Sequence, residues 1–456
     1  MRIRRSYLQI IFYLILFLSS IFKAANTNLL IQFFFIGFAS FFLLCNFKKN
    51  IIAEIKYNFK KNKFFFIPLF LVLIYIIIQI IPFPIETFGQ YFPIHLELIN
   101  NLELSKKFIT ISVDPSNTYF QILNFLNLII IFSLVPVLFN KNKDIMNLLF
   151  IFGLIGAFHA FFATYWLLIG NPSNALIIKE FYLHTATGFF VNRSNFSIFL
   201  LLCAFASLYF INFYIKLNNF KLNFIEQLNS PIIYQRFCIL FITIGIVLTL
   251  SRAGNFSYIL MLSLIILSSF LITKKILNSV FNTIVLILVI DVAFIGFYFG
   301  GSQLIGRYSI VTDFTTSLDS TTSYTRLTMI IFAIEKFKEF FFFGYGLGGF
   351  EQIFKIYFNI VNDVYSNHVH NDIVEFLGEF GVVGSIFLLC LLINYFVLII
   401  KSVKKKKLTI LHPILILILF STLLINSLVD FSLHIPAIQY FLCTLAAIGL
   451  TKFNTK

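Results

Sequence analysis

Apolar runs long enough to cross a membrane recur from one end of the chain to the other. We expect spans over residues 7–22, 29–47, 64–81, 119–139, 145–169, 196–214, 237–250, 258–272, 284–299, 382–400, 408–428 and 435–450. A helix needs about 20 mostly apolar residues to cross the hydrocarbon core of a bilayer. The mean hydropathy of +0.93 and the 12% of charged residues agree with this pattern. The sequence therefore predicts an all-α, polytopic integral membrane protein with about 12 transmembrane helices.

The basic residues gather in alternate connections between these runs. Of the 34 Lys and Arg residues, 23 lie in residues 1–6, 48–63, 140–144, 215–236, 273–276, 401–407 and 452–456. The same segments hold three acidic residues: Glu54, Asp144 and Glu226. The positive-inside rule places such segments in the cytoplasm, together with both ends of the chain. The net charge of +15 is thus an orientation signal, and we expect no nucleic-acid partner.

The first apolar run could be a signal peptide, because it follows Met-Arg-Ile-Arg-Arg and has small residues near its end. We expect instead that it is retained as a span, since the next run begins almost at once as its return helix. One membrane domain over residues 1–456 is the predicted organisation.

The largest outer loop, about residues 300–380, has helical periodicity of its own. Helices are expected over 325–338, over 350–364 and from 371 onward, with the glycine-rich 344–349 (GYGLGG) as a turn between the first two. In the third helix Asp372, Glu375 and Glu379 stand at i, i+3 and i+7, which places them on one face. They could simply be favourable charges at a helix N-terminus.

This loop contains the strongest candidate for acid–base chemistry. His370 could act as a general base, because an imidazole titrates near neutral pH. Its neighbour Asn371 could orient it or a substrate hydroxyl. His368 could pair with His370 on a metal ion, but no third ligand has convincing spacing, and we expect no metal site. A hydrogen-bonded structural histidine is the alternative interpretation of His370.

Four arginines stand in outer segments, against the general orientation of charge: Arg193, Arg252, Arg307 and Arg326. A guanidinium group keeps its charge and matches phosphate oxygens, so these residues could bind an anionic substrate. Contacts with lipid headgroups are the alternative for each of them. Asp291 lies within a predicted span and has no assigned role.

Two sequence features that the chain lacks limit the reactions and sites that it can be expected to have. The chain has no D-x-D pair, which disfavours a glycosyltransferase that uses a metal held by acidic residues. Its five cysteines lie inside apolar runs without ligand spacing, which predicts neither a zinc site nor a disulfide framework. We expect no cofactor.

Several motifs together resemble the O-antigen ligase and O-antigen polymerase superfamily of bacterial envelope membrane proteins. They are ISVDPSNTYFQ (111–121), TGFFVNRSNFS (187–197), LSRAG (250–254), Arg326 followed by GYGLGGF (344–350), HVHNDIVEFLGEFGVVG (368–384) and NSLVDFSLHIPA (426–437). They occur in the family's order across most of the chain. Two details differ from the family, which often has a proline where Phe341–Phe343 stands and a histidine near Ser194-Asn195.

The resemblance implies a metal-independent, inverting transfer of a glycan from an undecaprenyl-diphosphate carrier. It places the active face on the periplasmic side of the bacterial inner membrane, among membrane lipids. His370, Arg252 and Arg326 would form the catalytic set, with Arg193, His368 and Asn371 as substrate-binding residues. We favour ligation to lipid A–core, with a polymerase that extends a glycan acceptor as the alternative. A transporter of small solutes or anions is the second alternative.

Overall fold

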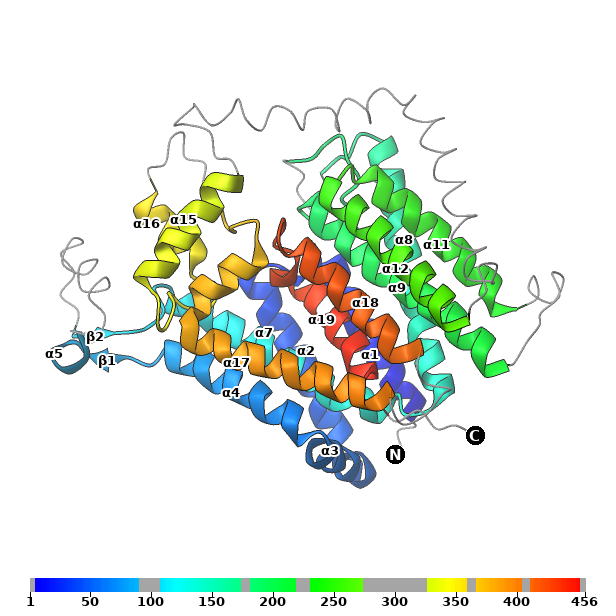
Figure 1. Cartoon of the computed structure of the whole chain (residues 1–456), viewed down its shortest axis with the longest axis horizontal. Coiled ribbons are helices and arrows are strands. Elements are labelled where there is room, and N and C mark those ends of the chain that lie inside the picture. The colour runs from blue at the N-terminus through cyan, green and yellow to red at the C-terminus, as the bar shows by residue number, and fades with distance from the viewer. Residues whose placement is uncertain are drawn as a thin grey trace.

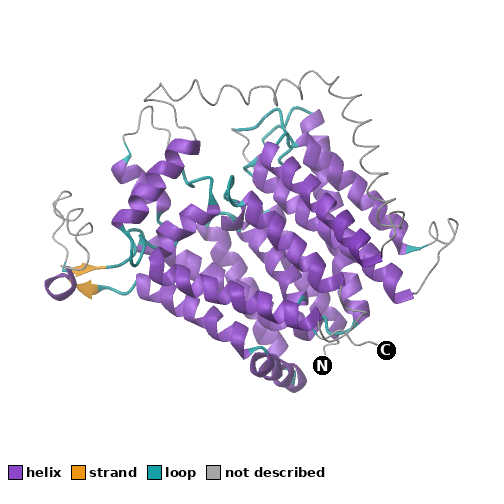
Figure 2. Cartoon of the chain, in the orientation of Figure 1, coloured by secondary structure: helices purple, strands orange, loops and turns teal. Residues whose placement is uncertain are grey.

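The computed structural model describes residues 5–89, 107–173, 181–218, 230–273, 326–358, 366–403 and 411–451. These residues are almost entirely helical (Figure 2). The helices are α1 (Arg5–Ile21), α2 (Asn28–Asn46), α3 (Lys49–Lys61), α4 (Lys63–Gln79), α5 (Ile85–Phe88), α7 (Pro115–Leu138), α8 (Asn142–Leu168), α9 (Arg193–Asn218), α11 (Pro231–Leu248), α12 (Arg252–Thr273), α15 (Arg326–Glu339), α16 (Phe350–Tyr357), α17 (Asp372–Val403), α18 (Leu411–Asn426) and α19 (Pro436–Ile448). Short 3₁₀ turns, η1 (Lys23–Ala25) and η6 (Ser432–His434), precede α2 and α19. A two-residue strand pair, β1 (Phe83–Pro84) with β2 (Phe108–Ile109), is antiparallel with Phe83 opposite Ile109.

Seven helices among the described residues are long and apolar enough to cross a membrane: α2, α7, α8, α9, α11, α12 and α17. The α3–α4 pair, bent by 93°, passes the same test as a unit, and α1, α18 and α19 contain shorter apolar helices. Every predicted span that falls on described residues coincides with one of these elements, which confirms the polytopic helical fold. The number twelve stays a prediction, and residues 284–299 lie outside the described residues together with Asp291 and Arg307.

The helices form two groups that meet along a central layer (Figure 1). Helices α8, α9, α11 and α12 pack together on one side. Helices α4 and α17 pack as a pair on the other side, and α2, α7 and α19 lie between. One large apolar cluster runs through the central layer and the α8–α12 group. Helices α15 and α16 lie over the beginning of α17 and have a separate small core.

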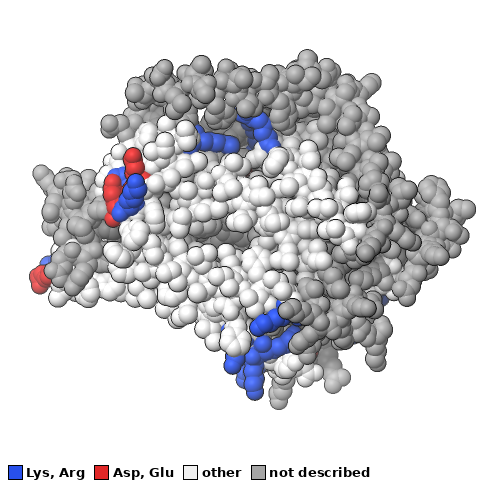
Figure 3. Space-filling model, viewed as in Figure 1, with Lys and Arg blue, Asp and Glu red and all other residues white. Residues whose placement is uncertain are grey.

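The α3 end of the molecule carries the basic charge that the orientation rule assigns to the cytoplasm. Helix α3 buries Ile51 and Ile55 and exposes Lys56 and Lys60, as in a helix that lies flat on a membrane surface. Figure 3 shows Lys and Arg side chains gathered at this end, beside a broad surface without charge. Arg5, the first residue of α1, pairs with Glu54 of α3 at 3.1 Å, so α1 begins here.

A backbone break divides α17 into a short acidic helix and a long apolar one. Gly381 has φ 60° and ψ −172°, a conformation that is open almost only to glycine. A Cβ there would lie 2.4 Å from the Gly344 nitrogen, and Gly344 itself has φ 72°. Hydrogen bonds from the Val382 and Val383 N–H groups to the carbonyls of Phe341 and Phe342 hold the two backbones together. The predicted span over 382–400 begins directly after this break.

The GYGLGG segment is a turn, as expected, and it is packed against the acidic part of α17. The Tyr345 N–H donates to the Gly378 carbonyl, and the Gly346 N–H donates to the Glu379 carbonyl. The Gly348 N–H donates to Glu379 Oε1 at 2.7 Å. The turn therefore fixes the position of the Glu379 side chain.

Candidate functional site

The segment from His368 to His370 forms one part of the candidate site. Val369 is fully buried in the small core under α15 and α16, which anchors the segment between His368 and His370. His370 has φ +61°, a left-handed conformation that is uncommon outside glycine and typical of functional sites when a bulky residue adopts it. Both rings contact Phe431, which lies between α18 and α19. The His368 ring stacks on it at 4.3 Å between centroids, and the His370 ring meets it edge-on at 4.8 Å.

The three carboxylates of α17 face His434, the last residue of η6. Asp372 Oδ1 lies 2.6 Å from His434 Nδ1. On the other side of the ring, Nε2 lies 3.4 Å from Glu379 Oε2 and 3.7 Å from Glu375 Oε1. All three carboxylates are buried, which confirms the shared face that their spacing predicted.

This acidic surrounding determines the charge of His434. Burial by itself lowers the pKa of the imidazole, because the charged form loses water. Glu375, Asp372 and Glu379 outweigh burial and raise the pKa of His434 well above its usual value. His434 is therefore a buried cation that holds three carboxylates in place.

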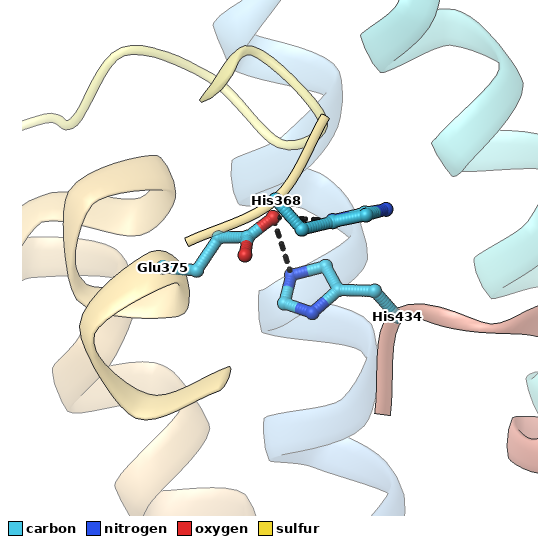
Figure 4. Close-up of side chains that lie close together, drawn as sticks. All are labelled: His368, Glu375 and His434. Carbon is cyan, nitrogen blue, oxygen red and sulfur yellow. Dashed lines mark hydrogen bonds and ion pairs between the residues drawn. The ribbon is translucent and has the colours of Figure 1, made fainter. Parts of the chain in front are cut away.

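His368 completes this cluster from the other side of Glu375, as Figure 4 shows. Its Nδ1 atom lies 2.7 Å from Glu375 Oε1, and Glu375 Oε2 accepts a hydrogen bond from the Val369 N–H at 2.8 Å. One ligand atom from each of His368, Glu375 and His434 fits within 4.8 Å of the others, so these residues could hold a metal ion. The sequence had offered His368 and His370 as a pair without a third ligand. That no metal binds stays a prediction.

Asp430 connects His370 to two neighbouring helices. The Asp430 side chain is fully buried, and its Oδ1 atom lies 4.0 Å from His370 Nδ1. That nitrogen is buried and makes no hydrogen bond within the described residues. Asp430 Oδ2 accepts a hydrogen bond from the Ser194 hydroxyl, and the Asp430 carbonyl accepts one from the Asp372 N–H at 3.0 Å. The two side chains are therefore within ion-pair distance but are not hydrogen-bonded to each other.

Two of the predicted arginines begin helices beside the serines of this network. Arg193 is the first residue of α9, and Arg252 is the first residue of α12. The Ser251 hydroxyl donates to the Ser194 hydroxyl at 3.1 Å, which joins the two helix starts to Asp430. The helix dipole adds positive potential at both positions, which favours anions.

The remaining predicted residues have separate surroundings. The Arg193 guanidinium lies 5.2 Å from the centre of the Tyr182 ring. Arg326, the first residue of α15, is exposed and donates from Nη1 to the Val429 carbonyl at 3.2 Å, one residue before Asp430. Asn371 caps α17, since its Oδ1 accepts from the Val374 N–H, and its Nδ2 donates to the Leu428 carbonyl. The structure thus gives Asn371 two structural contacts.

Two cavities open at the histidines. The larger has a volume of about 430 Å³ and is lined by Lys23, Ala24, Asn26, Phe181, Tyr182, Phe190, Val191, Asn192, Asn195, Ser366, Asn367, His368, His370, Phe431 and Ile435. The smaller, of about 160 Å³, is lined by Asn26, Thr27, Asn28, Ile31, Asn117, Gln121, Gly348, Phe350, Glu351, Asn367, His368, Glu375, Glu379 and His434. Both lie at the α2 end of α1, because Lys23–Asn28 connects these helices.

Sequence reasoning gave no role to Asp430, His434 or Lys23. Asp430 and His434 stand in the quoted NSLVDFSLHIPA motif. The sequence signal for them is that a carboxylate and an imidazole lie in a short polar interruption between two apolar runs. Their partners lie about sixty residues away in the chain, a distance that periodicity does not bridge.

Comparison with known proteins identifies one family. Residues 237–389 match the family model described as O-antigen ligase. This range contains Arg252, Arg326, His368 and His370, and it ends before Asp430 and His434. No curated protein matches the chain. The match over residues 237–389 confirms the resemblance that the motifs carry: this part of the chain is similar to O-antigen ligases, and the described residues form a polytopic helical membrane protein.

Proposed function

We propose that this protein transfers a glycan from an undecaprenyl-diphosphate carrier to lipid A–core at the periplasmic face of the inner membrane. The family match over residues 237–389 supports a membrane glycosyltransferase of the O-antigen ligase and polymerase type, with glycan and lipid substrates in general. The observation that carries the finer proposal is the placement of His370 and His368 on the wall of a cavity beside cationic helix starts.

The larger cavity is the donor site in this proposal. Its volume of about 430 Å³ lies within the range typical of ligand sites. Lys23 on its wall would contact the diphosphate, together with Arg193, which packs on the lining residue Tyr182. Arg252 and Arg326 would stabilise the negative charge that grows on the departing carrier, because fixed guanidinium groups need no reorganisation during the reaction.

His370 is the general base. The acceptor hydroxyl oxygen attacks the anomeric carbon of the donor sugar from the face opposite the diphosphate, and its proton passes to a ring nitrogen of His370. The bond between the anomeric carbon and the phosphate oxygen breaks, and undecaprenyl diphosphate leaves with the electron pair. This displacement inverts the anomeric configuration. Asp430 orients the imidazole and stabilises its protonated form.

Positive charge from the protein replaces a metal ion in this account. The arginines act on the diphosphate, while the raised pKa of His434 supplies a cation that keeps Glu375 and Glu379 in place beside His368. His368 would contact substrate in either cavity, because it lines both. Asn371 would act through the turn that it caps.

The direction of α1 supports the periplasmic placement. Arg5 begins this helix beside α3, at the basic end, and Lys23 follows its last turn at the larger cavity. Its 17 residues rise about 26 Å, close to the hydrocarbon thickness of a bilayer. If α3 faces the cytoplasm, as its charge predicts, the cavity faces the periplasm.

A deletion strain tests the function. It is complemented with the wild type, His370→Ala, Arg252→Ala or the control Lys56→Ala, which alters an exposed lysine of α3. Lipopolysaccharide and the undecaprenyl-linked pool are then analysed. Loss of capped lipopolysaccharide with long lipid-linked chains, reversed by the wild type and Lys56→Ala only, supports a ligase. Single-unit caps in the deletion strain indicate a polymerase, and an unchanged ladder and pool would favour transport.

A further inference from the structure

We infer that the smaller cavity binds the terminal sugar of the acceptor, and that it selects a hydroxyl-rich sugar without negative charge. The inference rests on the proposed function, because it divides donor and acceptor between two cavities of one site. Neither the sequence motifs nor the family match assigns this cavity a ligand.

The lining of the smaller cavity has the chemistry of a sugar site. Five of its side chains are amides, namely Asn26, Asn28, Asn117, Gln121 and Asn367, each with both donors and acceptors for hydroxyl groups. Three more are the carboxylates of Glu351, Glu375 and Glu379, and the wall contains no lysine or arginine. The cation on this wall, His434, is already engaged by Asp372 and Glu379, so an anionic sugar would meet carboxylates without a guanidinium or ammonium partner.

The larger cavity has the opposite character. It contains Lys23 and no acidic residue, and the Arg193 guanidinium packs on the ring of Tyr182, one of its lining residues. The two cavities share Asn26, Asn367 and His368 on their walls. A donor diphosphate in the larger cavity and an acceptor hydroxyl in the smaller one would therefore meet at the boundary that these shared residues form. His370 lines the larger, donor cavity.

A strained turn forms part of the boundary. Lys23, Ala24 and Ala25 have φ values of 44°, 56° and 57°, a left-handed conformation that is sterically unfavourable for residues other than glycine. Ala24 and Ala25 are buried, so packing holds the turn in this form. The turn directs Lys23 to the larger cavity and places Asn26 at the boundary. Strain of this kind is typical of segments that position ligands.

The size of the smaller cavity limits what it holds. Its volume of about 160 Å³ is below the range for drug-sized ligands, which suits one sugar ring and not a whole oligosaccharide. Selectivity would therefore be determined by the sugar that carries the attacking hydroxyl.

Binding measured without donor tests this inference separately from catalysis. The probes are two synthetic glycolipids in nanodiscs that have the same lipid and end in glucose or in glucuronic acid. They are titrated against the full-length wild type, Gln121→Leu and Gln121→Lys. Gln121 is half-buried and lines the smaller cavity only. Asn394→Leu and Asn394→Lys, which alter a half-buried amide on α17 that lines neither cavity, are the matched controls.

We expect the wild type to bind the glucose probe at least about tenfold more tightly than the glucuronic acid probe. Gln121→Leu should weaken binding of the glucose probe, and Gln121→Lys should reduce the preference to near unity, whereas the Asn394 variants should match the wild type. Equal binding of both probes by the wild type, or a preference that Gln121→Lys leaves intact, would overturn the inference. Selective binding without any transfer from a lipid-linked donor would leave the inference standing and refute the proposed function.

Discussion

The Nδ1 atom of His370 lies 4.0 Å from Oδ1 of Asp430, sixty residues further along the chain. Asp430 is fully buried, and its other carboxylate oxygen holds Ser194 at the start of α9. Its backbone carbonyl holds the first N–H of α17. The same residue thus lies beside the candidate base and fixes the two helix starts nearest to it.

Asp430→Asn should lower the turnover number by about 100-fold, with little change in the KM for the donor. The amide keeps the size of the side chain and a contact with Ser194, but it does not stabilise a protonated His370. Initial rates at varied donor concentration measure the two constants. Asp430→Glu, which restores the charge, should recover part of the rate. A normal turnover number in Asp430→Asn would show that His370 acts without this carboxylate.

Arg252→Ala should lower kcat/KM for the donor by roughly 10- to 100-fold, mainly through kcat, since a hydrogen bond to a charged group contributes about 1.5–3 kcal/mol. Arg252→Lys should lie between this variant and the wild type, because lysine keeps the charge but loses the planar fork. Donor titrations in proteoliposomes check the order. Lys56→Ala on α3 is the control. An equal change in the donor kinetics of this variant would mean that any loss of positive surface charge has the same consequence.

His434→Gln should lower the stability of the purified protein most strongly below about pH 6.5, by around 3 kcal/mol, because it leaves buried carboxylates without their cation. The pKa of His434 is raised in the folded state, so its contribution is complete below the unfolded value and is lost as the pH rises through the folded one. Unfolding midpoints in detergent, measured from about pH 6 to pH 9, should therefore converge for the two proteins. A difference that grows with pH would contradict the assignment of a charged His434.

Gly381→Ala should destabilise the protein by at least about 1–3 kcal/mol, because the backbone conformation there is open almost only to glycine. The added Cβ would also lie 2.4 Å from the Gly344 nitrogen. The matched control is Gly37→Ala on α2, where the Cβ would have open space and the helix should gain slightly. Thermal unfolding of both variants gives the comparison, and equal midpoints would mean that the break in α17 is not required.

The span pattern was predictable because each apolar run forms its helix locally, largely without regard to its neighbours. The acidic face of α17 was predictable for the same reason, since positions i, i+3 and i+7 of a helix align whatever packs against them. The structure gives a role to Ser194 and Asn195, where the family often has a histidine. Ser194 donates to Asp430, and Asn195 Oδ1 accepts from the Ser432 hydroxyl at 3.1 Å.

The partners of these residues were not predictable. His434 meets Asp372 across sixty-two positions, and only the packing of η6 on α17 brings them together. The left-handed turn at Lys23–Ala25 contains no glycine, so nothing in its residue types signalled it. The contact of His368 with Glu375 was not predicted either, because it depends on how the segment before α17 folds back on the first turn of that helix.

The most direct test of glycan transfer uses the purified full-length protein in proteoliposomes, with a lipid-linked glycan donor, lipid A–core and a chelator. The wild type should form capped lipid A–core and release undecaprenyl diphosphate in equal amounts. His370→Ala should reduce both products by at least about 100-fold while binding the donor normally. Full activity of His370→Ala, or transfer by the wild type only after a divalent metal is restored, would contradict the mechanism.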